Sequence, residues 1–211
     1  MSLNTELRAL HETRRQQIPA DVGAVMDRAA AELAAGGHTA NALGVGGLAP
    51  GFRLPSATGR TVDLADLLAL GPVVLTFYRG AWCPYCNLAL RSLQQHHTAI
   101  AAHGAQLVAV SPQTPDESMS LAEKHALAFE VLSDAGAGTA KQYGLAHDLP
   151  EELSAVYARF APDAAGVPHT LPLAATYVID RAGTVRWAFV DPDFTRRAEP
   201  ADILTALAAL A

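Results

Sequence analysis

The pattern of apolar and polar positions divides the chain into amphipathic helices and short apolar strands. Apolar residues spaced three and four apart predict two helices within residues 1–40, separated at Pro19. Their apolar stripes consist of Leu3, Leu7 and Leu10 in the first helix and of Val22, Met26, Ala29 and Leu33 in the second. The pattern leaves two roles open, a helical hairpin packed on its own domain or a contact between two copies of the chain.

Three continuous apolar runs predict buried strands at residues 71–78, 105–111 and 129–134. Runs without alternation are typical of parallel strands that are covered on both faces. A helix is expected after the first strand, ending at about residue 102. A capping box of Thr114 and Glu117, with Pro115 at the first helical position, predicts a second helix. A short helix is expected at 137–144.

Tight turns predict antiparallel pairs before and after this unit. Thr58-Gly59 joins two short extended segments, and residues 181–183 join strands at 176–180 and 184–190. A last helix is predicted from Pro200, whereas residues 145–172 are expected to be irregular apart from a helical piece at 150–160. The order of elements predicts an α/β fold with a mixed sheet flanked by helices.

Composition narrows the class of protein. The 211 residues carry a net charge of −6 without a dense basic stripe, so nucleic acid is not an expected partner. No apolar run approaches the roughly 18 residues that a membrane helix needs. The first residues lack an apolar signal core, so we expect a soluble, cytoplasmic protein. We divide it into a helical extension, residues 1–42, and one α/β domain, residues 43–211.

The two cysteines of the chain, Cys83 and Cys86, lie three residues apart where a helix should begin. In a reducing compartment such a pair is more typical of redox chemistry or metal binding than of a structural disulfide. Unpartnered backbone N–H groups at a helix start stabilise anions, so the pKa of Cys83 is predicted to fall below the free value of about 8.5. Cys86 shares the apolar face of the helix with Leu90 and Leu93, which predicts a buried sulfur, whereas the sulfur of Cys83 is predicted to be exposed. The two sulfurs are close enough to form a disulfide.

The neighbours of the pair carry several possible roles. Pro84 suits the first helical turn, where its missing N–H costs little. Trp82 and Tyr85 either supply apolar surface beside the sulfurs or are ordinary packing residues. Arg79 could add positive potential or bind a peroxide oxygen, and its alternative is a solvated loop residue. A zinc site is the competing use of the cysteines, but zinc usually takes four ligands, and His96 and His97 lie too far along the helix.

The sequence blocks around the cysteines resemble a known family. The segments APGFRLPSATGRTVDL, GPVVLTFYRG, VAVSPQTPDES, EKHALAFEVLSDAG and ATYVIDRAGTV are similar, in order, to those of peroxiredoxins of the alkyl hydroperoxide reductase/thiol-specific antioxidant (AhpC/TSA) type. The WCPYC segment resembles thioredoxin-superfamily motifs, and CPYC is the glutaredoxin form. The resemblance implies a thioredoxin-like, peroxiredoxin-type fold and a subgroup with an FYRGxWCPYC block.

The resemblance also implies a reaction. Cys83 would attack a hydroperoxide and become a sulfenic acid, and Cys86 would condense with it to form a Cys83–Cys86 disulfide. Thioredoxin or glutathione would then restore the dithiol, without a bound cofactor. A homodimer is expected, because peroxiredoxin-like proteins often dimerise.

The chain departs from the family pattern at three positions. Typical members have a proline seven residues before the cysteine and Thr or Ser three before it; counted from Cys83 these positions are Thr76 and Gly80. A family arginine is replaced by Ala174. Arg79, Arg196 or Arg197 could supply the missing guanidinium, although VDPDFTRR is more typical of a charged loop between strand and helix. A glutaredoxin- or thioredoxin-like thiol–disulfide oxidoreductase, a redox sensor and a non-enzymatic scaffold therefore remain alternatives.

Overall fold

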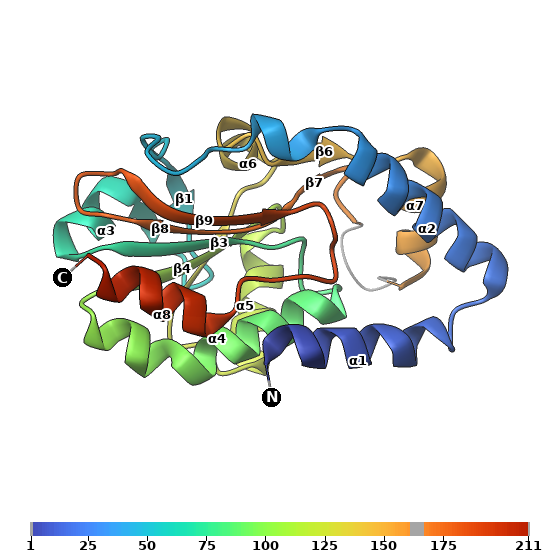
Figure 1. Cartoon of the computed structure of the whole chain (residues 1–211), viewed down its shortest axis with the longest axis horizontal. Coiled ribbons are helices and arrows are strands. Elements are labelled where there is room, and N and C mark those ends of the chain that lie inside the picture. Colours follow the sequence, from blue (N-terminus) through green and yellow to red (C-terminus); the bar gives the residue numbers. More distant parts are fainter. Residues whose placement is uncertain (1, 161–166, 211) are drawn as a thin grey trace.

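A computed structural model describes residues 2–160 and 167–210 and contains a mixed, five-stranded central sheet (Figure 1). The strand order is β5-β4-β3-β8-β9. The bounds are β3 (Val73–Phe77), β4 (Gln106–Ser111), β5 (Glu130–Ser133), β8 (Ala174–Ile179) and β9 (Val185–Asp191). β4 pairs in parallel with β3 and β5, whereas β8 runs antiparallel to β3 and β9. The predicted α/β fold with a mixed sheet is therefore confirmed.

Both faces of the sheet are covered, which explains the continuous apolar runs in its strands. Val74 of β3 faces the core that contains α4 and α8, whereas Val73 and Leu75 face the core that contains α3 and α6. The helices of the domain are α3 (Leu64–Leu70), α4 (Pro84–Ala102), α5 (Pro115–Lys124), α6 (Gly138–Gln142) and α8 (Pro200–Ala208). The predicted capping box of Thr114 and Glu117 begins α5.

The two predicted N-terminal helices are present as α1 (Leu3–Arg15) and α2 (Ala20–Ala35), but they do not pack on each other as a hairpin. They diverge from a shared turn (Figure 1). α1 packs on α4 and buries Leu3 and Leu7 in its core, whereas α2 packs on α7 (Glu151–Phe160). Each apolar stripe thus finds a different partner on the same domain. The contact between two chains stays a prediction.

Residues 145–172 are more regular than the sequence predicts. β6 (Ala146–Asp148) and β7 (Thr170–Pro172) form an antiparallel pair, and α7 confirms the helical piece expected between them. Strands of three residues are too short to show an alternating pattern, and their pairing crosses a whole helix. β1 (Arg53–Pro55) and β2 (Thr61–Asp63) form the expected first hairpin, and a short 3-10 helix, η1 (His38–Asn41), follows α2. Among the described residues, no helix is long and apolar enough to cross a membrane.

Candidate active site

Cys83 is held at the start of α4 by the turn that follows β3. It is the N-cap residue of α4 and Pro84 takes the first helical position, as the sequence predicts. Gly80 makes this turn possible, because its φ of 148° is rare for other residues and a Cβ there would lie 2.5 Å from Trp82 Nε1. The fold therefore places the sulfur at a helix N-terminus, next to the carboxyl end of a central parallel strand.

Both sulfurs are fully buried. Cys83 and Cys86 are free thiols with 0% exposure, and they share a core with Leu90 and Leu93. The predicted burial of Cys86 is confirmed, whereas the predicted exposure of Cys83 is wrong. The cause is long-range packing, because Tyr157 of α7 and Phe194 of the β9–α8 segment gather around its neighbour Arg79.

Each sulfur accepts a hydrogen bond from a buried guanidinium. Arg79 Nη2 lies 3.2 Å from Cys83 Sγ, and Arg197 Nη2 lies 3.1 Å from Cys86 Sγ. The arginines are 7% and 5% exposed, so Arg79 is not the solvated loop residue that was the alternative. Arg196, in contrast, is a surface residue paired with Asp191. Two buried positive charges thus face the two sulfurs. We call Cys83 and Cys86 the redox pair.

Aromatic rings enclose Arg79. Its guanidinium carbon lies 4.6 Å from the centre of the Phe194 ring, 5.1 Å from that of Trp82 and 5.5 Å from that of Tyr157. Arg79 Nη1 also donates to the Tyr157 hydroxyl at 3.0 Å. Such contacts stabilise a desolvated cation. Tyr157 and Phe194 lie 78 and 115 positions beyond Arg79 in the chain, so no local sequence signal links them to it.

Tyr85 connects the start of α4 to α1. Its ring packs edge-on against Phe194, with 5.4 Å between the ring centres. Its hydroxyl lies 3.0 Å from His11 Nδ1. Trp82 and Tyr85 are therefore packing residues and neighbours of the redox pair at once, which resolves the two alternatives left open by the sequence.

The surroundings split the pKa values of the two thiols. Burial, followed by hydrogen bonding to Cys86, raises the pKa of Cys83 well above its ordinary value. Burial also acts to raise the pKa of Cys86, but hydrogen bonding to Cys83 and the charges of Arg197 and Arg79 outweigh it and hold this pKa well below its ordinary value. The predicted low pKa therefore applies to the coupled pair, which holds one thiolate, and not to Cys83 alone. Each sulfur has one guanidinium donor, and the helix start adds to the donors around Cys83.

Two of the three positions at which the chain departs from the pattern of the family it resembles, Thr76 and Ala174, lie in the sheet. Thr76 Oγ1 donates to the Ala175 carbonyl at 3.2 Å and lies 3.0 Å from Thr176 Oγ1. Ala174 is buried at the start of β8 and has no polar side chain. Arg79 and Arg197 supply the guanidinium groups instead, from the loops before α4 and before α8.

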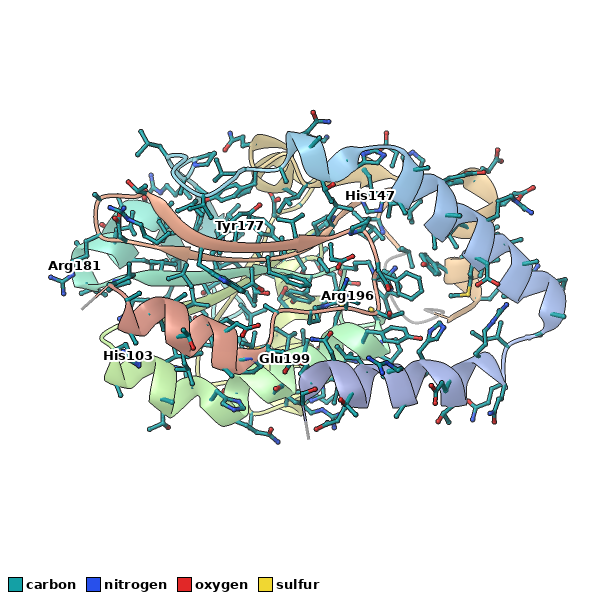
Figure 2. All side chains as sticks on the ribbon, viewed as in Figure 1. His103, His147, Tyr177, Arg181, Arg196 and Glu199 are labelled. Carbon is teal, nitrogen blue, oxygen red and sulfur yellow. The ribbon has the colours of Figure 1, made fainter. Side chains whose placement is uncertain are left out.

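A small cavity adjoins Arg79 between α2 and α7. Its volume is about 30 Å³, and Met26, Leu153 and Phe194 are among its apolar lining residues. His147 also lines it, and burial, together with the charges of Arg79 and His38, lowers the pKa of this histidine to about 4. A space of this size suits a molecule comparable to water. A groove of about 1040 Å³ near His103 and Arg181 lies at the other end of the molecule and borders neither cysteine (Figure 2).

Metal-ligating side chains do not gather elsewhere in the described structure. Within residues 2–160 and 167–210 no three His, Cys, Asp or Glu side chains are placed to hold a metal ion. His96 Nδ1 lies 2.8 Å from the Ser92 carbonyl, one turn back along α4, and the ring of His97 packs against Phe129. The side chain hydrogen-bonded to Cys86 is the guanidinium of Arg197, which is not a metal ligand.

Comparison with known proteins places this geometry in a family. The AhpC/TSA family model matches residues 45–188. The chain is 27% identical over 171 residues to the chloroplastic peroxiredoxin Q of Triticum aestivum, covering 81% of this chain and 70% of that protein. It is 30% identical over 105 residues to peroxiredoxin Bcp of Escherichia coli K12, covering 50% and 67% of the two chains. Its match with the peroxiredoxin Q of Populus jackii spans 55% of that protein.

Solved structures agree with the sequence comparison. The crystal structure of peroxidoxin BcpB from Mycobacterium tuberculosis is similar with a TM-score of 0.64 and 26% identity, covering 79% of this chain and 97% of that one. The family match covers most of the domain, and the redox pair at the start of α4 lies within the matched residues. The chain belongs to the AhpC/TSA family.

Proposed function

We propose that the protein is a thiol peroxidase that reduces hydrogen peroxide or small organic hydroperoxides through the redox pair. The observation that carries this proposal is the placement of two free thiols, each hydrogen-bonded to a buried guanidinium, at the start of α4. The peroxiredoxin relatives support a peroxidase over a thiol–disulfide oxidoreductase or redox sensor.

The first step is attack of a thiolate on the terminal oxygen of the hydroperoxide. An S–O bond forms, the O–O bond breaks, and the departing alkoxide or hydroxide takes up a proton to leave as alcohol or water. The sequence-based assignment gives this attack to Cys83. The geometry supports this assignment, because Cys83 stands at the start of α4, Arg79 donates to its sulfur, and the cavity between α2 and α7 ends at Arg79. A guanidinium beside the sulfur also stabilises the charge that develops on the peroxide oxygens.

The second and third steps return the pair to its starting state. The other thiol attacks the sulfenic sulfur, so an S–S bond forms and hydroxide leaves with a proton as water. Two external thiol groups then reduce the Cys83–Cys86 disulfide by exchange. We propose thioredoxin or glutathione as the reductant and the cytoplasm as the compartment, because reducing conditions keep such a pair as dithiol. Sulfur carries both electrons, so the cycle needs no bound cofactor.

Peroxide reaches the buried pair beside Arg79 in this proposal. The cavity between α2 and α7 ends on this residue, whose guanidinium donates to Cys83. Its volume of about 30 Å³ accommodates hydrogen peroxide, whereas longer hydroperoxides require Met26 or Phe194 to move. The homodimer stays a prediction, which sedimentation of the full chain would test.

Stopped-flow consumption of hydrogen peroxide by the reduced protein tests the function. We expect a rate constant well above that of a free thiol at the same thiolate concentration, and equality with the free thiol would overturn the proposal. Faster reduction of a mixed glutathione disulfide than of peroxide would instead favour the oxidoreductase.

Two single variants test which sulfur attacks. Cys86→Ser should consume one equivalent of peroxide and stop with a sulfenic acid on Cys83, visible by mass spectrometry. Cys83→Ser should lose turnover, because it removes the sulfur that faces Arg79 at the end of the cavity. The opposite pattern would assign the attack to Cys86.

A further inference from the structure

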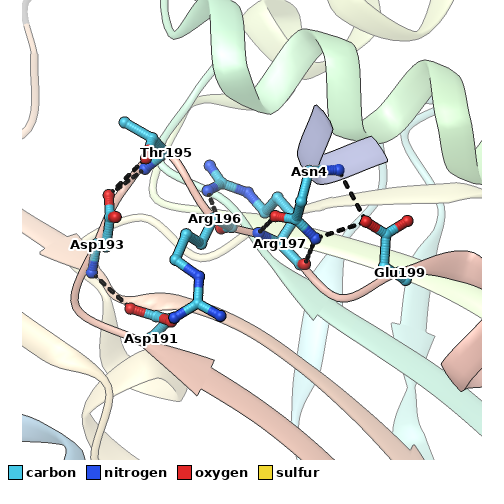
Figure 3. A network of polar contacts seen from close by, with 7 residues as sticks. All are labelled: Asn4, Asp191, Asp193, Thr195, Arg196, Arg197 and Glu199. Atoms are coloured by element: carbon cyan, nitrogen blue, oxygen red, sulfur yellow. Dashed lines mark hydrogen bonds and ion pairs between the residues drawn. The ribbon is translucent and has the colours of Figure 1, made fainter. Parts of the chain in front are cut away.

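The start of α1 meets the segment between β9 and α8 beside the redox pair. Figure 3 shows Asn4 of α1 bonded to both Arg197 and Glu199. Asn4 Oδ1 accepts from the Arg197 backbone N–H at 3.0 Å, and Asn4 Nδ2 donates to the Arg197 carbonyl at 2.7 Å. One amide side chain therefore satisfies both main-chain groups of the residue whose guanidinium faces Cys86.

Glu199 fixes Asn4 in this position. Its carboxylate accepts hydrogen bonds from the backbone N–H groups of Leu3 and Asn4, at 2.9 and 2.8 Å, and from Asn4 Nδ2 at 2.8 Å. Burial acts to raise the pKa of Glu199, but these hydrogen bonds outweigh it and lower the pKa. The carboxylate stands at the N-terminal end of α1, where the helix dipole favours a negative charge. Glu199 is the N-cap residue of α8, yet its side chain makes no capping bond to that helix and serves α1 instead.

The guanidinium of Arg197 is oriented by the same segment. Nη1 donates to the carbonyls of Phe194 and Arg196, at 2.8 and 2.6 Å, which leaves Nη2 directed at Cys86 Sγ. Among the described residues, no carboxylate lies within ion-pair distance of this guanidinium. The sulfur of Cys86 is therefore the anionic partner of the buried Arg197 guanidinium. The other titratable or charged groups that face this sulfur are Tyr78, Arg79 and Cys83.

We propose that Asn4 and Glu199 are positioning residues that hold the Arg197 guanidinium against Cys86, which makes α1 a functional part of the redox site. We call the pair the Asn4–Glu199 clamp. The proposal extends the proposed peroxidase by naming the element that keeps one sulfur ionised. It gives the N-terminal helix a role besides the packing of Leu3 and Leu7 in the core.

The thiolate of the reduced protein, titrated by its ultraviolet absorbance, measures the clamp without any peroxide. Asn4→Ala removes both bonds to the Arg197 main chain but keeps the apolar anchors of α1. We expect the midpoint of the thiolate titration to rise by about one pH unit, because the charged hydrogen bond from Arg197 to Cys86 is weakened. Alkylation by iodoacetamide should then show the same shift in its pH profile. Glu199→Gln, which keeps an acceptor, should shift the midpoint less.

Arg196→Gln is the matched control, because Arg196 neighbours Arg197 but pairs with Asp191 at the surface. It should leave the titration unchanged. If Asn4→Ala does not fold, Asn4→Ser serves, since it shortens the side chain and breaks the paired bonds to the Arg197 main chain without adding a charge beside Glu199. A folded Asn4 variant with the midpoint of the parent protein, or an equal shift in Arg196→Gln, would overturn the proposal. Slow peroxide consumption together with the expected shifts would refute the peroxidase and leave the clamp intact.

Discussion

Replacing Arg79 by methionine should make the Cys83–Cys86 disulfide harder to reduce. In the dithiol state the guanidinium donates to a sulfur of a pair that carries a negative charge. In the disulfide state that charge is gone, and a residue that is only 7% exposed keeps its positive charge without the anion. Arg79 therefore stabilises the reduced form relative to the oxidised form. Methionine is unbranched and apolar, so it preserves contact with the surrounding rings while removing the charge.

The size of the effect follows from the single hydrogen bond of 3.2 Å between Arg79 and Cys83. Hydrogen bonds to charged groups contribute about 1.5–3 kcal/mol. Since 1.4 kcal/mol corresponds to about 30 mV for a two-electron couple, the reduction potential should fall by about 30–60 mV. The Tyr157 hydroxyl loses its partner in both redox states, so that cost largely cancels from the potential.

Equilibration of the protein with thiol–disulfide buffers, followed by trapping of free thiols, measures this potential. Arg196→Gln provides the control for a lost surface charge and should change the potential by less than about 10 mV, since exposed charges are screened. An Arg79→Met potential equal to or higher than that of the parent protein would refute the reasoning, because the guanidinium would then favour the disulfide or neither state.

Three further changes test the fold around the site. Leu7→Ala should lower the free energy of unfolding by about 2–5 kcal/mol in urea, since Leu7 is fully buried against α4, and a loss below about 1 kcal/mol would mean that α1 is loosely attached. Asp134→Ala should cost about 2–4 kcal/mol, because the buried carboxylate accepts from two backbone N–H groups at the start of α6, and an unchanged urea midpoint would contradict this. The pKa of His147, lowered to about 4 from an ordinary 6.5, contributes stability that is complete above pH 6.5 and is lost as the pH falls through about 4. Between pH 6.5 and about 4, the free energy of unfolding should therefore fall less in His147→Leu than in the parent protein, by up to about 3 kcal/mol. Identical pH dependence in both proteins would be inconsistent with a buried neutral histidine.

Local sequence signals predicted most of the fold because each element carries its own signal. The apolar run at 71–78 gave β3, and Thr114 with Glu117 gave the start of α5. Cys83 at the start of α4 followed from its position after a buried strand. The pairing of β6 with β7 has no such local signal, since its three-residue strands are joined only through α7.

The electrostatics of the redox pair depend on contacts that no local pattern encodes. Arg197 reaches Cys86 across 111 positions of sequence, and Tyr157 reaches Arg79 across 78. A helix start lowers the pKa of a thiol at its N-cap only when burial does not dominate. Here burial opposes ionisation at both sulfurs, and the two guanidiniums compensate for it across the pair. The sequence offers both Arg196 and Arg197 in VDPDFTRR as candidates, and only the folded structure distinguishes them, because Arg197 contacts Cys86 whereas Arg196 pairs with Asp191.

Titration of the thiolate absorbance in the reduced parent protein and in both single cysteine variants tests the central claim directly. We expect one thiolate with a midpoint well below about 8.5 in the parent protein, and a midpoint below about 8.5 in each variant, because one guanidinium still faces the sulfur that remains. Ionisation of both sulfurs only at about pH 8.5 or above would contradict the account, because two buried guanidiniums would then fail to hold an anion between them.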